Sequence, residues 1–365
     1  MRKRRKRRNK ALQVVLICLI CLCILVAFGV AAFAITSSMG NKKLRQQATT
    51  NAPVLIKTEP EELETELESE TEIEKEEPLK EGEIIYNGQK YRYNEEILTF
   101  AIMGIDYMGT VDELLKESMG GHSDMNFLAV INPRKKSLEL IAINRNSMTQ
   151  IHRYATDGSY VDTVDAQITL QHAYGTGGAD SCEKMVAAID NLMYMIPIHG
   201  YFSMNMGAIM MLNDAVGGVE LVAVEDVIFQ KTDIRRGDKV VLLGKDAFWY
   251  VKYRDVDVVE SANGRLQRQK QYINAFIQKM KHMIKQDLSL PIDLYKIVAE
   301  YSVTDITIDE MTYLVSQVAG YSFDLGNIHT VPGETVVNGE YEEFYVDEDG
   351  LYEMIVDLFY EPVME

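Results

Sequence analysis

The chain has 365 residues and a formal net charge of −18, and 47% of its residues are hydrophobic, enough apolar material for one large domain or two small ones. Eight of the 37 basic residues lie within the first ten positions, which leaves 29 basic residues against 55 acidic ones for the rest. A body this acidic excludes nucleic acid as a partner for most of the protein.

The amino-terminal region has the pattern of a membrane anchor. A basic tail, residues 1–10, directly precedes Ala11–Ile35, a run without a charged residue. Because a helix needs about 20 apolar residues to cross the bilayer, we predict a transmembrane helix over residues 11–36. Basic residues stay on the cytoplasmic side, so this single-pass protein of the cell membrane has its N-terminus inside and the rest of the chain outside. The alternative is a cleaved signal peptide, since residues 32–34 read Ala-Phe-Ala, but the apolar run is longer than such peptides use.

An acidic extracellular linker is predicted over residues 37–95. Its central stretch, Thr58–Gly82, carries twelve Glu against two Lys. Such a segment repels itself and has too little apolar surface to fold alone. We therefore predict a disordered stalk that holds the domain away from the bilayer.

The remaining chain, residues 96–362, is predicted to form one α/β domain. Short apolar runs bounded by turn residues predict strands within Ile97–Asp106, Phe127–Pro133, Ser137–Arg145 and Val219–Val224. The turn residues between the second and third runs indicate a hairpin. Strands that alternate with helices favour a mixed β-sheet layered between helices.

Helical spacing marks three further segments. Asp180–Met195 carries apolar residues on one face, with Asp180 and Glu183 placed as a capping box. Val303–Gly320 resembles a capped helix, and Glu342–Phe359 ends in another. We assign both to the same domain.

An unusual basic segment, Asn263–Gln271, reads NGRLQRQKQ and contains no acid. If Gly264 ends a loop and Arg265 starts a helix, Arg265 and Arg268 border the apolar stripe of that helix. A half-buried guanidinium without a carboxylate suits a phosphate, which it can bind in bidentate fashion, and the helix terminus adds free amides. The alternative is an ordinary surface helix.

Other charged residues lie at predicted strand ends. Asp106 ends one strand, Asp124 begins the next, and Arg145 ends a third. Side chains at strand ends of α/β sheets commonly project into active sites. Two carboxylates can hold Mg²⁺, and Mg²⁺ with arginines neutralises a pyrophosphate. For either acid alone, a plain loop position is the alternative.

The order of these motifs resembles the LytR-CpsA-Psr (LCP) family of cell-wall proteins. The segments that carry the resemblance are MGID, SDMNFLAVINPRKKSLELIAINRNSM, LQHAYGTGG, IHGYFSMNMGAIMMLNDAVGGVEL, LLGKDAFWYVKYR and GRLQRQKQYINA, from about Ile97 to about Lys285. The resemblance implies an LCP-like α/β/α domain in a membrane-anchored phosphotransferase with pyrophosphatase side activity. Such an enzyme moves an anionic glycan, such as teichoic acid or capsule, from a polyprenyl pyrophosphate carrier to peptidoglycan.

The resemblance also implies roles for individual residues. Asp106 and Asp124 would hold Mg²⁺, and Arg145, Arg265 and Arg268 would be catalytic. Pyrophosphate binding would fall to Arg145, Lys252, Arg254, Arg265, Arg268 and Gln269. Phosphoryl transfer depends mostly on positioning and charge neutralisation, which these residue types supply.

The chain also departs from the family pattern. Asn146 stands where family members usually have an acid, and Lys252 stands where they usually have an arginine. Just before the GR pair, where an acid is usual, this chain has Ala262 and Asn263. An amide cannot accept a proton as a carboxylate does, and a lysine lacks the bidentate fork. Two hypotheses therefore remain: a Mg²⁺-dependent transferase, or a non-catalytic module that binds polyprenyl pyrophosphate or wall glycan as a scaffold or regulator.

Overall fold

The structure is a computed structural model, and it describes residues 33–45, 79–117, 120–155, 157–255, 258, 261–287, 289–339 and 341–364. The predicted membrane span lies outside these residues except for its end, residues 33–36. No helix within the described ranges has the length and apolar character needed to cross a membrane.

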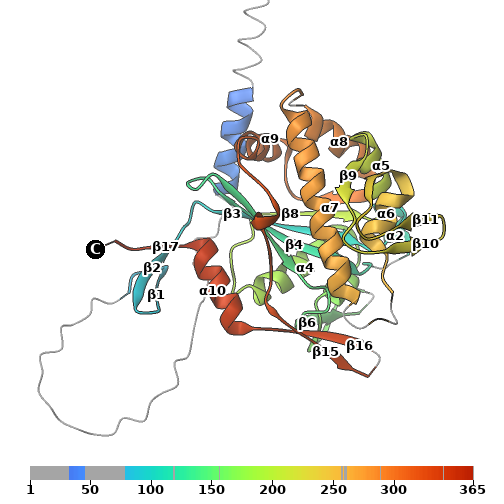
Figure 1. Ribbon diagram of the computed structural model, residues 1–365. Helices are drawn as coiled ribbons and strands as arrows, with labels where there is room; N and C mark the ends of the chain where they lie inside the picture. Colours follow the sequence, from blue (N-terminus) through green and yellow to red (C-terminus); the bar gives the residue numbers. More distant parts are fainter. Residues whose placement is uncertain are drawn as a thin grey trace, which may run out of the picture.

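A mixed sheet forms the centre of the fold (Figure 1). Its strands, in spatial order, are β13 (Ser302–Thr304), β8 (Tyr201–Asn205), β3 (Leu98–Ile105), β4 (Ser123–Asn132), β5 (Ser137–Ile143) and β14 (Ile328–Thr330). β3 pairs antiparallel with β4 and parallel with β8, whereas β5 pairs antiparallel with β4 and parallel with β14. The predicted mixed sheet and the hairpin between β4 and β5 are confirmed.

The other strands of the described residues form five small sheets. These are β1 (Glu83–Tyr86), β2 (Gln89–Tyr93) and β17 (Tyr360–Pro362); β6 (Met148–Tyr154) and β7 (Tyr160–Gln167); β9 (Val219–Val222) and β12 (Lys239–Leu242); β10 (Val227–Phe229) and β11 (Thr232–Ile234); and β15 (Gly333–Asn338) and β16 (Tyr341–Val346).

Helices cover both faces of the central sheet. The helices are α2 (Val111–Lys116), α3 (Thr169–Ala173), α4 (Gly178–Leu192), α5 (Ala208–Ala215), α6 (Gly244–Lys252), α7 (Ser261–Ile284), α8 (Leu290–Val298), α9 (Ile308–Val318) and α10 (Glu348–Phe359), with 3-10 turns η1 (Ala299–Tyr301) and η2 (Leu325–Asn327). α6 and α8 pack with β9 and β12 in a separate apolar core. Apolar side chains of α4 and α10 pack on one face, and those of α7 and α9 pack on the other. The two predicted carboxyl-terminal helices, α9 and α10, are confirmed.

The alternation of side chains along β3 explains the layers. Met103 and Ile105 join the core under α4 and α10, whereas Leu98 and Phe100 join the core under α7 and α9. Because successive residues of a strand point to opposite faces, a continuous apolar run serves a sheet covered on both sides. The ends of β3, β4 and β5 thus lie between two helical layers.

Two predicted helix starts were wrong. α4 begins at Gly178, and Asp180 accepts hydrogen bonds from the Thr176 backbone instead of forming the expected capping box. α7 begins at Ser261, so Gly264 lies inside the helix and not in a loop. A β-carbon at Gly264 would lie 2.5 Å from a carboxylate oxygen of Glu225, the flexible end of a side chain that is 44% exposed.

The predicted linker, residues 37–95, was too long at both ends. Residues 33–45 form a helix whose Leu44 is buried in the core beside α9, and Lys43 donates a 3.0 Å hydrogen bond to Asp309 of α9. At the other end, β1 and β2 pair with each other and with β17. Apolar residues outside the glutamate-rich stretch give these ends enough surface to pack. Residues 46–78, which include most of that stretch, lie outside the described part.

Candidate functional site

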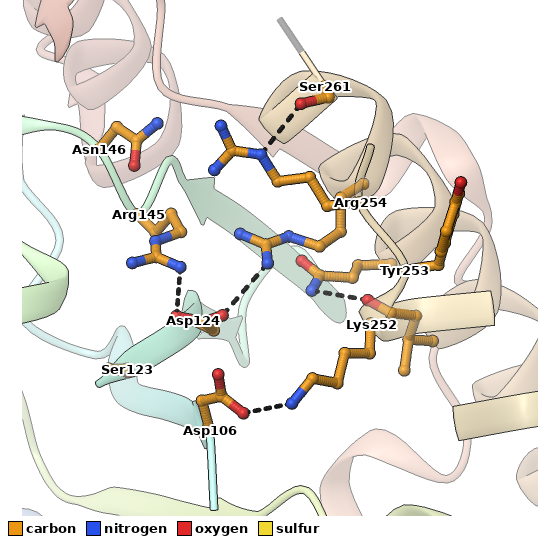
Figure 2. Close-up of polar contacts among 12 residues, drawn as sticks. Asp106, Ser123, Asp124, Arg145, Asn146, Lys252, Tyr253, Arg254 and Ser261 are labelled. Carbon is orange, nitrogen blue, oxygen red and sulfur yellow. Dashed lines mark hydrogen bonds and ion pairs between the residues drawn. The ribbon is translucent and has the colours of Figure 1, made fainter. Parts of the chain in front are cut away.

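Asp124 is the centre of a buried charge cluster. It lies at the start of β4, and its carboxylate contacts Arg145 Nη1 at 2.6 Å through Oδ1 and Arg265 Nη1 at 3.1 Å through Oδ2. Arg145 follows β5, and Arg265 lies in α7. Figure 2 shows Arg145 directed at Asp124. The fold therefore brings together three charges that are far apart in the sequence.

Burial shapes the electrostatics of this cluster. Burial lowers the pKa of the Arg265 guanidinium to about 10, Asp124 opposes that shift, and the neighbouring arginines add to it. Arg265 remains protonated at neutral pH, and Asp124 is its counter-charge. A buried arginine that is paired with one carboxylate and repelled by neighbouring arginines attracts additional negative charge.

Asp106 and Lys252 form a second, more open pair. Lys252 Nζ lies 2.5 Å from Asp106 Oδ1, with the side chains 27% and 38% exposed. Asp106 follows β3, and Lys252 ends α6. The Asp106 amide donates to the carbonyl of His122, just before β4, so Asp106 and Asp124 lie at adjoining strand ends (Figure 2).

Arg254 approaches the cluster from the connection between α6 and α7. Its Nε donates to Ser261 Oγ at 2.9 Å, and its Nη2 donates to Glu342 at 2.8 Å. Arg145 and Arg254 line one cavity of about 660 Å³. Asn146, Gln167, Tyr341 and Glu342 also line it.

Arg268 and Gln269 are directed elsewhere. Arg268 is buried and donates to Glu225 at 2.9 Å, to the Tyr250 carbonyl at 2.6 Å and to the Tyr253 carbonyl. Gln269 donates to the carbonyl of Val251 at 3.2 Å. Both residues thus bind the unpaired carbonyl end of α6 to α7. Neither lines the cavity with Arg145 and Arg254, and contact between them and a substrate stays a prediction.

The two expected metal ligands suit Mg²⁺. Asp124 Oδ1 is buried, and although Arg145 lies 2.6 Å away, the contact is not a directed hydrogen bond. It is therefore an acceptor without a hydrogen-bond donor among the described residues. Mg²⁺ is usually bound by one or two carboxylates plus substrate phosphates. Within the described ranges no group of three or more His, Cys, Asp or Glu side chains could hold a metal, so two carboxylates would need phosphate oxygens to complete the coordination.

Sequence reasoning missed several residues of the site. Glu225, Ser261 and Glu342 each hold one of the arginines, but nothing in their local sequence marks them. Glu342 lies on β16, nearly ninety positions beyond Arg254. The α7 segment contains no acid, so any carboxylate that pairs with its arginines has to come from another element. Nothing in the sequence indicated which carboxylates these are.

The sequence also matches the model of a known protein family. The family model described as the LytR_cpsA_psr family matches residues 60–358. The chain belongs to this family. The order of motifs thus identified it correctly, and the match extends past β16 to α10.

Two curated relatives with similar sequences carry transferase names. The chain is 30% identical over 220 residues to polyisoprenyl-teichoic acid--peptidoglycan teichoic acid transferase TagU of Enterococcus faecalis, covering 60% of this chain and 64% of that protein. It is 25% identical over 226 residues to the protein of the same name from Halalkalibacterium halodurans, covering 62% and 69%. The matched region thus spans about two thirds of these relatives.

The fold agrees with a solved LCP structure. TagV of B. subtilis superposes with a TM-score of 0.55 at 23% identity, covering 72% of this chain and 96% of that one. At this identity the likeness establishes the mixed α/β fold and no more.

Proposed function

We propose that this protein transfers an anionic glycopolymer from a polyprenyl pyrophosphate carrier to peptidoglycan, forming a phosphodiester. The observation that supports this most is the convergence of Arg145, Arg254 and Arg265 around Asp124 in an otherwise acidic protein. Each guanidinium contacts an internal carboxylate, so the expectation of arginines without a carboxylate partner was wrong. Binding through these arginines therefore requires the diphosphate to compete with Asp124 and Glu342 for them. The transferase names of the curated relatives point to the same reaction.

The residues of the chain divide the work between binding and charge stabilisation. Arg145 and Arg254, which line the cavity, bind the pyrophosphate, and Lys252 adds a cation at the more open end. Arg265, which contacts the Oδ2 atom of Asp124, would stabilise the charge that develops on the leaving phosphate. Mg²⁺ held by Asp106 and Asp124 would neutralise the pyrophosphate further. Water in place of the sugar acceptor would give pyrophosphatase side activity.

Membrane attachment is part of the proposal. A single span over residues 11–36, with its N-terminus in the cytoplasm, would place the domain outside the cell, where both the lipid carrier and peptidoglycan are accessible. The substrate would then reach the arginine cavity without leaving the bilayer surface.

A non-catalytic binding module is the second candidate. Asn146 is buried beside Arg145 and supplies no carboxylate, which favours binding without turnover. In that case the arginines would retain a polyprenyl pyrophosphate lipid but would not promote its cleavage.

Turnover by the full-length protein in lipid nanodiscs separates the two candidates. With Mg²⁺, a short-chain polyprenyl pyrophosphate-linked glycan and a soluble peptidoglycan oligosaccharide, we expect release of polyprenyl phosphate. Arg145→Ala and Arg254→Ala should each reduce the rate at least 100-fold. Arg134→Ala, an arginine 54% exposed in surface ion pairs, is the control that should keep it. Tight lipid binding without turnover by the unmodified protein would favour the binding module.

A further inference from the structure

The β15–β16 hairpin forms one wall of the arginine cavity. The Phe344 amide of β16 donates to the Asn146 carbonyl at 2.9 Å, and Gln167 Nε2 donates to the Glu342 carbonyl at 2.7 Å. The Phe344 ring is buried. The backbone of β16 is thus fixed at Glu342 and two residues later at Phe344. Figure 1 shows the hairpin beside β6, at the edge of the domain.

The hairpin contacts both places where the sequence lacks an expected acid. β16 binds the backbone of Asn146, and Asn263 of α7 lies 3.4 Å from Thr335 Oγ1 of β15. Asn263 also accepts a hydrogen bond from Asn144 at 3.0 Å. A network of amides and one hydroxyl therefore occupies these positions. None of these groups can take up a proton at neutral pH.

Glu342 brings a carboxylate into this region. Its side chain is 10% exposed, lines the cavity with Arg145 and Asn146, and accepts the 2.8 Å hydrogen bond from Arg254. We propose that Glu342 accepts the proton of the sugar hydroxyl that attacks the pyrophosphate, the part that Asn146 cannot perform. This inference rests on the proposed transferase function.

The step balances without a further reactant. The acceptor hydroxyl oxygen forms a bond to the phosphorus that carries the glycan. The bond from that phosphorus to the bridging oxygen breaks, and its electron pair leaves with polyprenyl phosphate. The hydroxyl proton passes to Glu342, which returns it to solvent after the product departs.

Arg254 couples substrate binding to this proton transfer. Before substrate binds, its guanidinium is the counter-charge of Glu342. A pyrophosphate oxygen that draws Arg254 away removes positive charge from the carboxylate. Loss of a nearby positive charge makes a carboxylate a stronger base, so the acceptor for the proton improves only when substrate is in place.

Three variants of the full-length protein test the proposal in the nanodisc assay. Glu342→Gln keeps the shape of the side chain and removes its basicity, and Glu342→Asp keeps a carboxylate on a shorter chain. Glu334→Gln makes the same change at an exposed position of β15 and is the matched control. Both transfer rate and affinity for the lipid-linked glycan are measured, with melting temperature as the check on folding.

We expect Glu342→Gln to lower kcat by about 100-fold or more, the usual effect of losing a general base, without weakening lipid binding. Glu342→Asp should recover part of the rate, and Glu334→Gln should match the unmodified protein. A Glu342→Gln rate equal to or above the unmodified rate would mean that Glu342 only competes for Arg254. A parallel loss of binding and rate would mean that it only positions Arg254. Either result overturns the inference while leaving the transferase proposal standing. No transfer by the unmodified protein would refute both.

Discussion

Asp124→Asn tests whether the charge cluster is a buried network or a set of surface contacts. The Asp124 side chain is only 3% exposed, and its partners Arg265 and Arg145 are 6% and 19% exposed. The asparagine fits the same space but leaves the two guanidiniums facing each other without a counter-charge. Removing one partner of a buried ion pair costs about 3–5 kcal/mol of unfolding free energy.

Asp106→Asn is the control, because it removes an acid from a more exposed ion pair. The Asp106–Lys252 pair is roughly one third exposed, and pairs of this kind contribute about 1 kcal/mol or less. We therefore expect Asp124→Asn to lower the unfolding free energy by at least about 2 kcal/mol more than Asp106→Asn does. Both variants remove a predicted Mg²⁺ ligand, so both should lose any stabilisation that added Mg²⁺ gives the unmodified protein.

Urea unfolding followed by tryptophan fluorescence measures these differences. The sequence contains a single tryptophan, Trp249, whose ring lies 4.3 Å from that of Phe229 in α6–β10 packing. Its emission therefore reports on the domain without interference from other tryptophans. Equal losses in the two variants without Mg²⁺, or a loss below about 1 kcal/mol in Asp124→Asn, would refute the buried-network reasoning.

Three further predictions concern stability and use the same urea measurement. Arg268→Met should cost about 2–4 kcal/mol because two carbonyls and Glu225 lose their donor, whereas Glu225→Gln, at a 44% exposed side chain, should cost under about 1 kcal/mol; similar costs would contradict the carbonyl-binding role. Leu44→Ala should cost about 3 kcal/mol because Leu44 is 1% exposed in the core, and a cost near zero would mean that the helix at residues 33–45 is not docked. His172 is buried, and burial lowers its pKa to about 4, so the unfolded chain takes up a proton between about pH 6.5 and 4 that the folded protein does not. As the pH is lowered from about 6.5 to 4, the unfolding free energy of the unmodified protein should therefore fall by up to about 3 kcal/mol more than that of His172→Gln. Parallel curves of unfolding free energy against pH would contradict this.

Half of the central sheet could be predicted because its signals are local, whereas β8, β13 and β14 were not predicted and the predicted strand at Val219–Val224 lies in a separate small sheet with β12. β3, β4 and β5 are apolar runs bounded by turn residues. α9 begins with a capping box, in which Glu310 follows Thr307 at the spacing typical of a helix start. Helix starts were harder to predict, because α7 begins at Ser261 and includes a glycine. A glycine inside a helix misleads a prediction that places glycines in loops, and Gly264 is the fourth residue of α7.

The arginines and the two strand-end acids of the candidate site could be predicted from the sequence, but the ion pairs between them could not. Arginines in an acid-free segment stand out against an acidic chain, so Arg265 and Arg268 attracted a functional interpretation. Their partners come from β4 and from the loop after β9, and a long-range ion pair leaves no periodic pattern in sequence. Arg265 and Arg268 are only three positions apart, yet one turns toward Asp124 and the other toward α6. Which partner each arginine of α7 meets thus depends on tertiary contacts.

The helix at residues 33–45 changes how the predicted anchor relates to the domain. Gly40 lies so close to α9 that a β-carbon there would be 2.1 Å from the Asp309 carbonyl oxygen, and Ser37 contacts Ser316 at 3.4 Å. If residues 11–36 span the membrane as we propose, the span leads directly into a helix that is packed on the domain. The acidic stretch then connects two points of the same folded body, residues 45 and 79, and does not separate that body from the bilayer. The distance between the arginine cavity and the lipid surface is then set by helix packing, which suits an enzyme whose substrate remains attached to a membrane lipid.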